Sequence, residues 1–177
     1  MARHDSGPEE LATDANPFAP VVAAHWDAVY RLLYTLSGNT HDTEDLTQET
    51  FLRALSRLSS FAPGTNMRAW LLRIASNAFF DVRRKRQRAR VESLSADLPG
   101  TATPPEHLLE LAEQGEVLKV ALEELSETAR LVFHLRAVED LPFREVAAIL
   151  GSTEEAARWH MHQARTRLLK RLAHLKG

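Results

Sequence analysis

The chain has 177 residues, of which 44% are hydrophobic, and its 7 glycines and 8 prolines are too few for a turn-rich all-β protein. It contains no cysteine, which excludes a disulfide framework and a thiolate zinc site, and no apolar run approaches the roughly 20 residues that cross a bilayer. A net charge of −2 gives by itself no sign of a nucleic-acid binder. The N-terminus lacks the basic-then-apolar order of a signal peptide, so we expect a cytoplasmic protein without membrane insertion.

The small net charge hides a strong segregation of charge along the chain. Residues 83–90 hold six positive charges in eight positions, and the segment after Glu155 is basic and contains no acid. Between them, seven glutamates lie from Glu106 to Glu127, and Lys119 is the only Lys or Arg in that stretch. Two basic patches separated by an acidic stretch are typical of a protein that contacts phosphates at two places, although solvated helix faces explain the charges equally well.

Residues 1–16 mix Gly, Pro, Asp, Glu and Ser without periodicity, and we expect them to form a mobile tail. In the range 18–36, apolar residues recur every three or four positions, which predicts a helix that ends at Gly38. A second helix is expected to begin at Thr40 or Asp42, since either side chain can cap it. The acidic residues of its first turn match the positive N-terminal end of a helix.

A loop is expected over residues 61–66, followed by a third helix that runs into the basic cluster. This helix carries Trp70 on its apolar stripe, as the first helix carries Trp26. Both tryptophans fall at helical spacing, so we expect them in the core and not stacked on bases. The three helices together make a first domain over residues 17–92.

Residues 93–112 are expected to form a linker, because their first part is rich in Ser, Asp, Gly and Pro. A second helical set follows in residues 113–177, with breaks at Ser126, at Asp140–Pro142 and at Gly151–Thr153. No segment has the pattern of a strand. The sequence therefore predicts an all-α protein of two small helical domains joined by a flexible linker.

The second domain contains a helix-turn-helix pattern. Its first helix has an apolar face of Phe143, Val146, Ala147 and Leu150 and stops at the turn glycine Gly151. The next helix has a basic face with Arg158, His162 and Arg165, and its apolar face consists of Ala157, Met161, Ala164 and Leu168. Such a pair places its second helix in the major groove of DNA. Hairpins of this kind also occur in bundles that bind nothing, so the pattern alone leaves both interpretations open.

Two blocks of the first domain closely resemble region 2 of the extracytoplasmic-function (ECF) sigma factors of the sigma-70 family. They are the helix Asp42–Phe51 and the loop and helix Phe61–Asn77. Residues 125–172 resemble region 4 of the same family, and the blocks occur in the family's order with a linker between them. The resemblance implies a sigma factor that binds core RNA polymerase and directs promoter recognition, melting and initiation of transcription.

The resemblance also implies the surfaces that meet the polymerase. Region 2 of this family docks on the clamp helices of the beta-prime subunit, and region 4 on the beta flap. The matching positions are Asp45, Gln48 and Glu49, which give one exposed helix face two carboxylates and an amide suited to a basic partner. Members of the family are commonly held inactive by an anti-sigma factor that covers both domains, and we expect one here.

The loop and the third helix resemble the part of the family that melts and reads the minus-ten promoter element. Phe61, Thr65 and Asn66 are candidates to line a pocket for an unstacked base, although a Phe that ends an apolar helix is as often a core residue. Asn77 matches a position near the upstream edge of this element, where an Asn side chain can bond a base edge. Contacts to the DNA backbone are expected from Arg68, Arg73, Arg83 and Arg84.

Region 4 departs from the family where specificity is read. Thr153 is suited to cap the recognition helix, but two glutamates follow it and would repel phosphates. Arg158 keeps the family's basic position, whereas Trp159 and His160 replace small and basic residues. We expect an unusual minus-thirty-five consensus, read by Thr153, Arg158, Trp159, His162, Gln163 and Arg165.

Other classes of function fit the sequence less well. His160 and His162 point to different helix faces and no further ligand completes a set, so we expect no metal. No catalytic constellation or cofactor-binding motif is present, and we expect neither an enzyme nor a cofactor. A one-component helix-turn-helix regulator is the closest alternative, but it would not need the first-domain blocks. A helical adaptor would account for the acidic segment but not for two basic patches.

Overall fold

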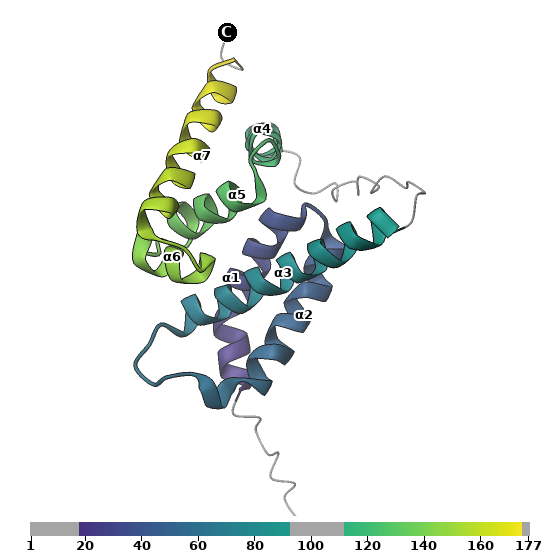
Figure 1. Cartoon of the computed structure of the whole chain (residues 1–177), viewed down its shortest axis with the longest axis vertical. Coiled ribbons are helices and arrows are strands. Elements are labelled where there is room, and N and C mark those ends of the chain that lie inside the picture. The colour runs from purple at the N-terminus through teal and green to yellow at the C-terminus, as the bar shows by residue number, and fades with distance from the viewer. Residues whose placement is uncertain (1–17, 93–111, 175–177) are drawn as a thin grey trace, which may run out of the picture.

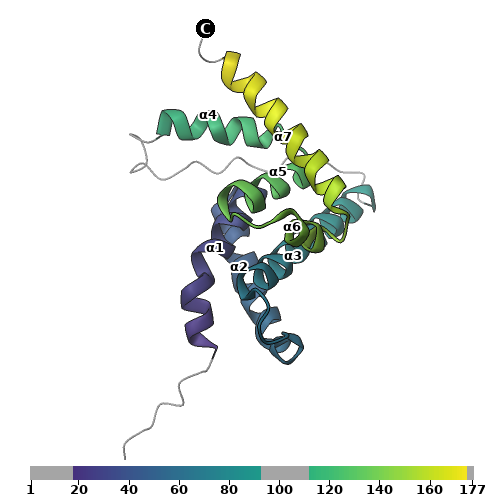
Figure 2. The same cartoon turned by 90° about the vertical axis from the view of Figure 1, so that its left-hand side faces the viewer.

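The computed structural model describes residues 18–92 and 112–174, and every regular element in these two ranges is helical. The expected tail, residues 1–16, and the expected linker as far as residue 111 lie outside the described residues. No helix within the described ranges is long and apolar enough to cross a membrane. Figures 1 and 2 show two groups of helices that pack against each other, so the predicted all-α fold with two helical domains is confirmed.

The first domain begins with helix α1 (Ala19–Ser37), which ends as predicted at Gly38, where a φ of +73° suits glycine. Helix α2 (Thr40–Ser56) is capped by Asn39, whose side chain accepts a hydrogen bond of 2.8 Å from the backbone N–H of Asp42. The prediction that Thr40 or Asp42 caps this helix is therefore wrong. Asn39 has the extended backbone that a capping residue needs, and both predicted residues already lie inside the helix.

A short 3-10 turn, η1 (Leu58–Ser60), leads into the loop before helix α3 (Met67–Glu92). The three helices pack on one another, and their mutual core contains side chains with no exposed surface, among them Leu32, Leu33, Leu71 and Leu72. Helix α3 buries its first half in this core. Beyond residue 82 it is exposed, so the basic cluster extends past the bundle.

The two tryptophans of this domain lie at the border of the core. Trp26 was expected to be buried but is 36% exposed, and its ring stacks on Phe51 with 5.6 Å between the ring centroids. Trp70 is half-buried and meets Phe61 edge to face at 5.2 Å. Helical spacing correctly predicts that both tryptophans contact the core. Because the indole ring is large, each ring covers the edge of the core and remains partly exposed.

The second domain consists of α4 (Ala112–Glu123), α5 (Glu127–Phe133), a π-helical turn η3 (His134–Val138), α6 (Phe143–Leu150) and α7 (Glu154–His174). The predicted breaks are confirmed by local hydrogen bonding and backbone geometry. The hydroxyl of Ser126 accepts a hydrogen bond from the N–H of Ala129 and so caps α5, and Gly151 ends α6 with a φ of +63°. The predicted apolar face of α7 is buried throughout.

The two domains share one apolar cluster. Helix α5 and turn η3 lie against α1, and α6 lies against α3, an arrangement visible in both views (Figures 1 and 2). Ile149 of α6 is only 6% exposed, although the sequence pattern did not place it on the apolar face of its helix. It lines a pocket at the domain boundary together with Ser76, Asn77 and Phe80 of α3. The sequence left the relative arrangement of the domains open, and the structure shows them closed on each other.

Removing a large side chain from the fully buried core should destabilise the protein strongly. We expect Leu71→Ala to lower the free energy of unfolding by about 2–5 kcal/mol, because it leaves a cavity that the surrounding helices fill only in part. Leu169→Ala is the matched control, since Leu169 is 68% exposed on α7 and should change stability by less than about 0.5 kcal/mol. Denaturant unfolding followed by circular dichroism measures both, and equal losses would contradict the packing described.

Candidate nucleic-acid interface

The acidic face of α2 presents the residues expected to meet the polymerase. Asp45 and Gln48 are exposed, and Glu49, one residue further on, is half-buried. A carboxylate oxygen of Glu49 accepts a 2.7 Å hydrogen bond from Arg53, which also donates to Asp81 of α3 at 3.2 Å. Glu49 is therefore tied back to its own domain. Gln48 and Asp45 are exposed, and the Asp45 carboxylate lies 3.7 Å from the Nε2 atom of His41 one turn earlier.

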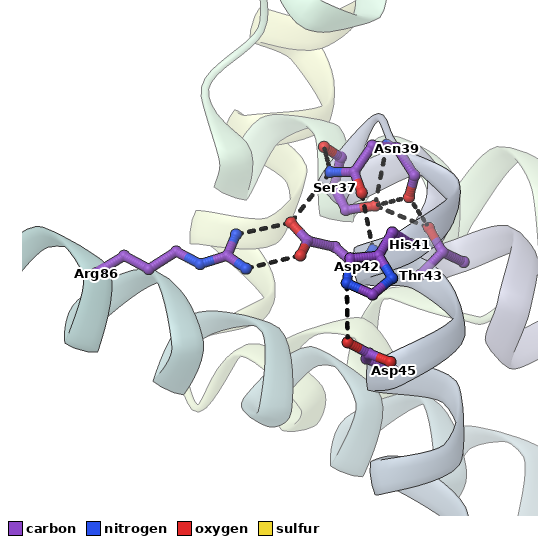
Figure 3. Close-up of polar contacts among 7 residues, drawn as sticks. All are labelled: Ser37, Asn39, His41, Asp42, Thr43, Asp45 and Arg86. Carbon is purple, nitrogen blue, oxygen red and sulfur yellow. Dashed lines mark hydrogen bonds and ion pairs between the residues drawn. The ribbon is translucent and has the colours of Figure 1, made fainter. Parts of the chain in front are cut away.

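A polar network at the start of α2 joins this helix to the basic cluster (Figure 3). Both carboxylate oxygens of Asp42 accept hydrogen bonds of 2.6 Å from the guanidinium of Arg86, and the side-chain amide of Asn39 donates to the same carboxylate at 3.0 Å. The Ser37 and Thr43 hydroxyls are 2.8 Å apart beside it. One of the positive charges of the cluster is thus neutralised inside the first domain, and the far half of α3 is held to α2.

The Arg86 guanidinium has a measurable consequence for Asp42. Its hydrogen bonds lower the pKa of the Asp42 carboxyl from 3.8 to about 2, assisted by the Asn39 amide and opposed by partial burial. Because the pKa is lower in the folded state, ionised Asp42 stabilises the fold above about pH 4 and this contribution disappears as the pH falls toward 2.

The loop before α3 carries the three residues expected to hold an unstacked base. Thr65 and Asn66 are exposed, whereas Phe61 is half-buried against Trp70. The Thr65 hydroxyl donates a 2.7 Å hydrogen bond to the carbonyl of Ala62, and the Asn66 side-chain carbonyl accepts one of 3.2 Å from Ala69. The loop is therefore ordered by its own polar side chains, and Asn66 caps α3.

Helix α3 carries the remaining candidates for the minus-ten element. Arg73, Asn77 and Arg84 are exposed and follow one another at spacings of four and seven residues, so they share one face of the helix. Arg83 is also exposed, and Arg68 is half-buried near the start of the helix. Arg84 donates to Asp81 one turn earlier at 2.7 Å, an exposed pair of little energetic weight.

Carboxylates of the second domain reach several of these residues. Glu145 of α6 accepts a 2.9 Å hydrogen bond from the side-chain amide of Asn66, and Glu127 of α5 accepts one of 2.6 Å from Arg83. Glu139, which follows η3, forms an ion pair with Arg68. Sequence reasoning named all three first-domain partners but none of these glutamates, because no local pattern marks a residue whose partner lies far along the chain.

Glu139 is the most buried of the three carboxylates, with no exposed side-chain surface. Besides Arg68 it meets Arg31 of α1 at 3.5 Å and the Nε2 atom of His134 at 3.3 Å. Burial opposes its ionisation, but the hydrogen bond with His134 and the charges of Arg68, His134 and Arg31 outweigh burial and hold the pKa of the Glu139 carboxyl below its usual value. The carboxyl is therefore ionised at neutral pH.

His134 is held between the two domains by both ring nitrogens. Its Nδ1 atom lies 3.0 Å from the hydroxyl of Thr35, which itself donates a hydrogen bond of 2.9 Å to the carbonyl of Arg31. With the hydroxyl proton used in this way, Thr35 offers an acceptor to Nδ1, and Glu139 offers one to Nε2. The ring therefore links α1 to the residue after η3 through both of its nitrogens.

A pocket of about 200 Å³ lies between α3 and the helix-turn-helix. Asn77 and Phe80 line it from the first domain, and Ile149, Ser152 and His160 line it from the second. The side chain expected to read the edge of the minus-ten element thus faces the second domain, within reach of its recognition hairpin.

The recognition helix α7 buries its apolar face, and its opposite face is exposed to solvent. Thr153 caps this helix as predicted, with its hydroxyl accepting from the N–H of Ala156 at 3.2 Å. Arg158 donates to Glu154 at 2.7 Å and lies over the ring of Phe143, and Trp159 is 57% exposed with its ring edge-on to His160. The other predicted readers follow on the same helix, His162 and Arg165 exposed and Gln163 half-buried.

These features define a class of protein, namely a two-domain helical protein in which a helix-turn-helix domain is joined to a bundle with a long arginine-rich helix. Comparison with known families places the chain more narrowly. Residues 21–89 match the family model for Sigma-70 region 2, and residues 116–168 match that for Sigma-70, region 4.

Curated relatives agree with the family models. The chain is 40% identical over 156 residues to the ECF RNA polymerase sigma factor SigE of Mycolicibacterium smegmatis, in a match that covers 86% of this chain and 60% of that protein. It is 32% identical over 145 residues to the ECF RNA polymerase sigma factor SigM of Bacillus subtilis, covering 79% of this chain and 85% of the relative. The chain thus spans well under the full length of SigE but most of the length of SigM.

Solved structures show the same arrangement of helices. The sigma factor RpoE of Bartonella quintana, in complex with the anti-sigma factor NepR, superposes with a TM-score of 0.78 at 29% identity, covering 88% of this chain and 96% of that one. CnrH in complex with the cytosolic domain of CnrY gives a TM-score of 0.65 at 29% identity, with 88% and 87% covered. The chain belongs to the sigma-70 family and, within it, to the ECF RNA polymerase sigma factors.

The link between Asp42 and Arg86 can be tested by titration. In Arg86→Gln, the pKa of the Asp42 carboxyl should rise from about 2 toward the ordinary value of 3.8, because the largest stabilisation of its charged form is lost. Arg88→Gln removes an exposed charge from the same cluster and should leave that pKa unchanged. Carboxyl-carbon NMR titration gives both values, and a pKa that stays near 2 without Arg86 would assign the shift to Asn39 instead.

Proposed function

We propose that this protein binds core RNA polymerase and directs it to promoters, where it helps to separate the DNA strands and begin transcription. The observation that carries the proposal is the pair of family matches, one to each domain, in the order that a sigma factor requires. We assign the two activities to residues 17–92 and residues 113–177. The catalyst in this scheme is the polymerase, and the sigma factor contributes binding and specificity in the cytoplasm.

The polymerase-binding surface is assigned to α2. Asp45 and Gln48 stand exposed on one helix face, and Glu49 lies beside them with Arg53 as its own partner. A charged and polar face of this kind suits the basic side of a coiled-coil partner, such as the clamp helices of the beta-prime subunit. A second contact, between the helix-turn-helix domain and the beta flap, follows from the family and completes the docking.

Promoter reading is divided between the domains. We assign the minus-ten element to the loop and helix from Phe61 to Arg84, where the exposed amides of Asn66 and Asn77 lie among arginines suited to contact phosphates. We assign the minus-thirty-five element to the outer face of α7, which presents Arg158, Trp159 and Arg165. Trp159 offers apolar surface to a thymine methyl group, and Glu154 neutralises part of the charge of Arg158, so this face differs from a purely basic one.

An anti-sigma factor is the proposed regulatory partner. The sigma factors of the two solved complexes described above are bound to NepR and to the cytosolic domain of CnrY. This chain superposes on each of them over most of its length, so it offers the surfaces for a comparable complex.

Reconstitution with core polymerase tests the proposed function directly. Purified protein added to core RNA polymerase from the source bacterium should produce transcripts that start at a defined set of genomic positions, while core enzyme alone should not. A one-component regulator would bind duplex DNA but would give no new starts with core enzyme alone. That result would overturn the sigma assignment in favour of the regulator.

Substitutions on the two surfaces should impair core binding and promoter recognition separately. Asn77→Ala should reduce initiation by about 10-fold or more while core binding stays within about twofold, since one bidentate base contact contributes about 1–3 kcal/mol. Gln48→Ala should weaken core binding, and initiation should recover at saturating protein. Affinity for core enzyme by fluorescence anisotropy and abortive initiation measure the two effects, and parallel losses in both variants would contradict the division.

A further inference from the structure

Phe143 is the first residue of α6, and two guanidinium groups lie over its ring. The guanidinium carbon of Arg158, from α7, is 4.9 Å from the ring centroid, and that of Arg136, from η3, is 5.5 Å from it. One aromatic ring thus joins three segments that meet beside the start of the recognition helix, namely η3, α6 and α7. The place of Phe143 on the apolar face of α6 does not account for either contact.

The ring of Phe143 has a defined position of its own. Pro142, directly before it, has a φ of −64° and an extended backbone from which α6 begins. The Phe143 side chain is partly buried and packs against the apolar cluster shared by the two domains. Arg136 donates to Asp140 at 2.7 Å and to the carbonyl of Leu141 at 3.4 Å, so it has partners besides the ring. The ring is therefore held in place by packing and does not depend on Arg158.

Arg158 lies near the N-terminal end of α7, where a recognition helix presents side chains to base edges. Its side chain is 53% exposed, and an exposed ion pair such as its 2.7 Å contact with Glu154 holds a long side chain only weakly. A guanidinium that donates to both acceptors of a guanine must lie close to the plane of that base pair. The face of the Phe143 ring attracts the guanidinium and supplies the second constraint on its orientation.

We propose that Phe143 is a positioning residue for the minus-thirty-five element, because its ring holds the Arg158 guanidinium in the orientation that reads a guanine. The inference rests on the proposed function, since it uses the role assigned there to Arg158. A guanidinium has five N–H donors, so Arg158 keeps donors for a base while one of its nitrogens is bound to Glu154. Phe143 acts through Arg158 and needs no contact with DNA of its own.

A positioning role of this kind affects discrimination between sequences more than general affinity. Contacts to phosphates tolerate many orientations of a guanidinium, whereas bidentate donation to a base edge does not. Loss of the Phe143 ring should therefore reduce the preference for guanine at the one position that Arg158 reads. Preferences at the other positions of the element should stay the same. A loss of folding in the second domain would instead lower the preferences at all positions together.

The experiment uses holoenzyme formed from core RNA polymerase and this protein. Transcription from a library of duplex promoters with a randomised minus-thirty-five segment gives the base preference at each position. Arg158→Ala identifies the position that Arg158 reads, because the preference there should disappear. Phe143→Met keeps a large apolar side chain but removes the ring. It should weaken the preference at the same position by about two- to fivefold, the factor that corresponds to a cation–π contact at an exposed site.

Two further variants separate the effect of the ring from that of packing. Phe143→Tyr keeps the aromatic face and should keep the wild-type preference. Phe133→Leu removes a partly buried ring elsewhere in the same domain, where it packs against a cluster that includes Ala121, Leu125 and Leu168, and it should leave the preference unchanged. Preferences at the other positions come from the same library, so they show for every variant whether the second domain is still folded.

The double variant Phe143→Met with Arg158→Ala tests whether the two residues act as one unit. The loss of the ring should have no further effect once Arg158 is absent. The proposal is overturned by an additive loss in the double variant, by an equal loss at all positions, or by an Arg158→Ala variant that changes no preference. If the wild type directs no promoter-specific transcription, the proposed function fails. If it does so and Phe143→Met keeps the full preference, the positioning role alone fails.

Discussion

The Glu139 carboxylate is buried between the two domains, and its ion pairs with Arg31 and Arg68 fix how the domains are placed against each other. A buried ion pair is seldom a large source of net stability, because desolvation offsets the Coulombic gain, and the shared apolar cluster supplies most of the attraction. The carboxylate instead determines the relative placement of the two domains. The placement seen here adds Arg31 and Arg68 to its own-domain partner His134, and a different closed placement would leave the buried carboxylate with His134 alone.

The elements of the fold were predictable wherever the determinants are local. Helix ends at Gly38 and Gly151 need a left-handed residue at a single position, and the caps at Ser126 and Thr153 satisfy a backbone N–H three residues away. Helical periodicity correctly predicted the buried face of α7. The family was recognisable from contiguous blocks such as the helix at Asp42–Phe51, where each residue is read without knowledge of the rest of the fold.

The contacts between the domains were not predictable, because they join residues far apart in sequence. Arg31 and Glu139 are separated by 108 positions, and Arg68 and Glu139 by 71, so no periodic pattern links them. The apolar pattern of the hairpin did not include Ile149, because the residues beside it lie in α3, more than sixty positions earlier in the sequence. Asn39 was overlooked as a cap because Thr40 and Asp42, equally good capping residues, follow directly. Sequence reasoning thus named Asn66, Arg68 and Arg83 as candidates but not the three carboxylates that contact them.

The exposed outer face of α7 has a consequence for how the proposed sigma factor binds DNA that contains no promoter. Attachment to arbitrary genomic duplex is governed by how many phosphates a protein neutralises, and each such contact steepens the dependence of binding on salt. With Arg68 and Arg83 engaged internally, the closed chain presents to the chromosome mainly the basic residues of α7 and the exposed arginines at the end of α3. For the proposed function, this means that binding of the closed chain to non-promoter duplex should depend less steeply on salt than binding of a form in which Arg68 and Arg83 are free.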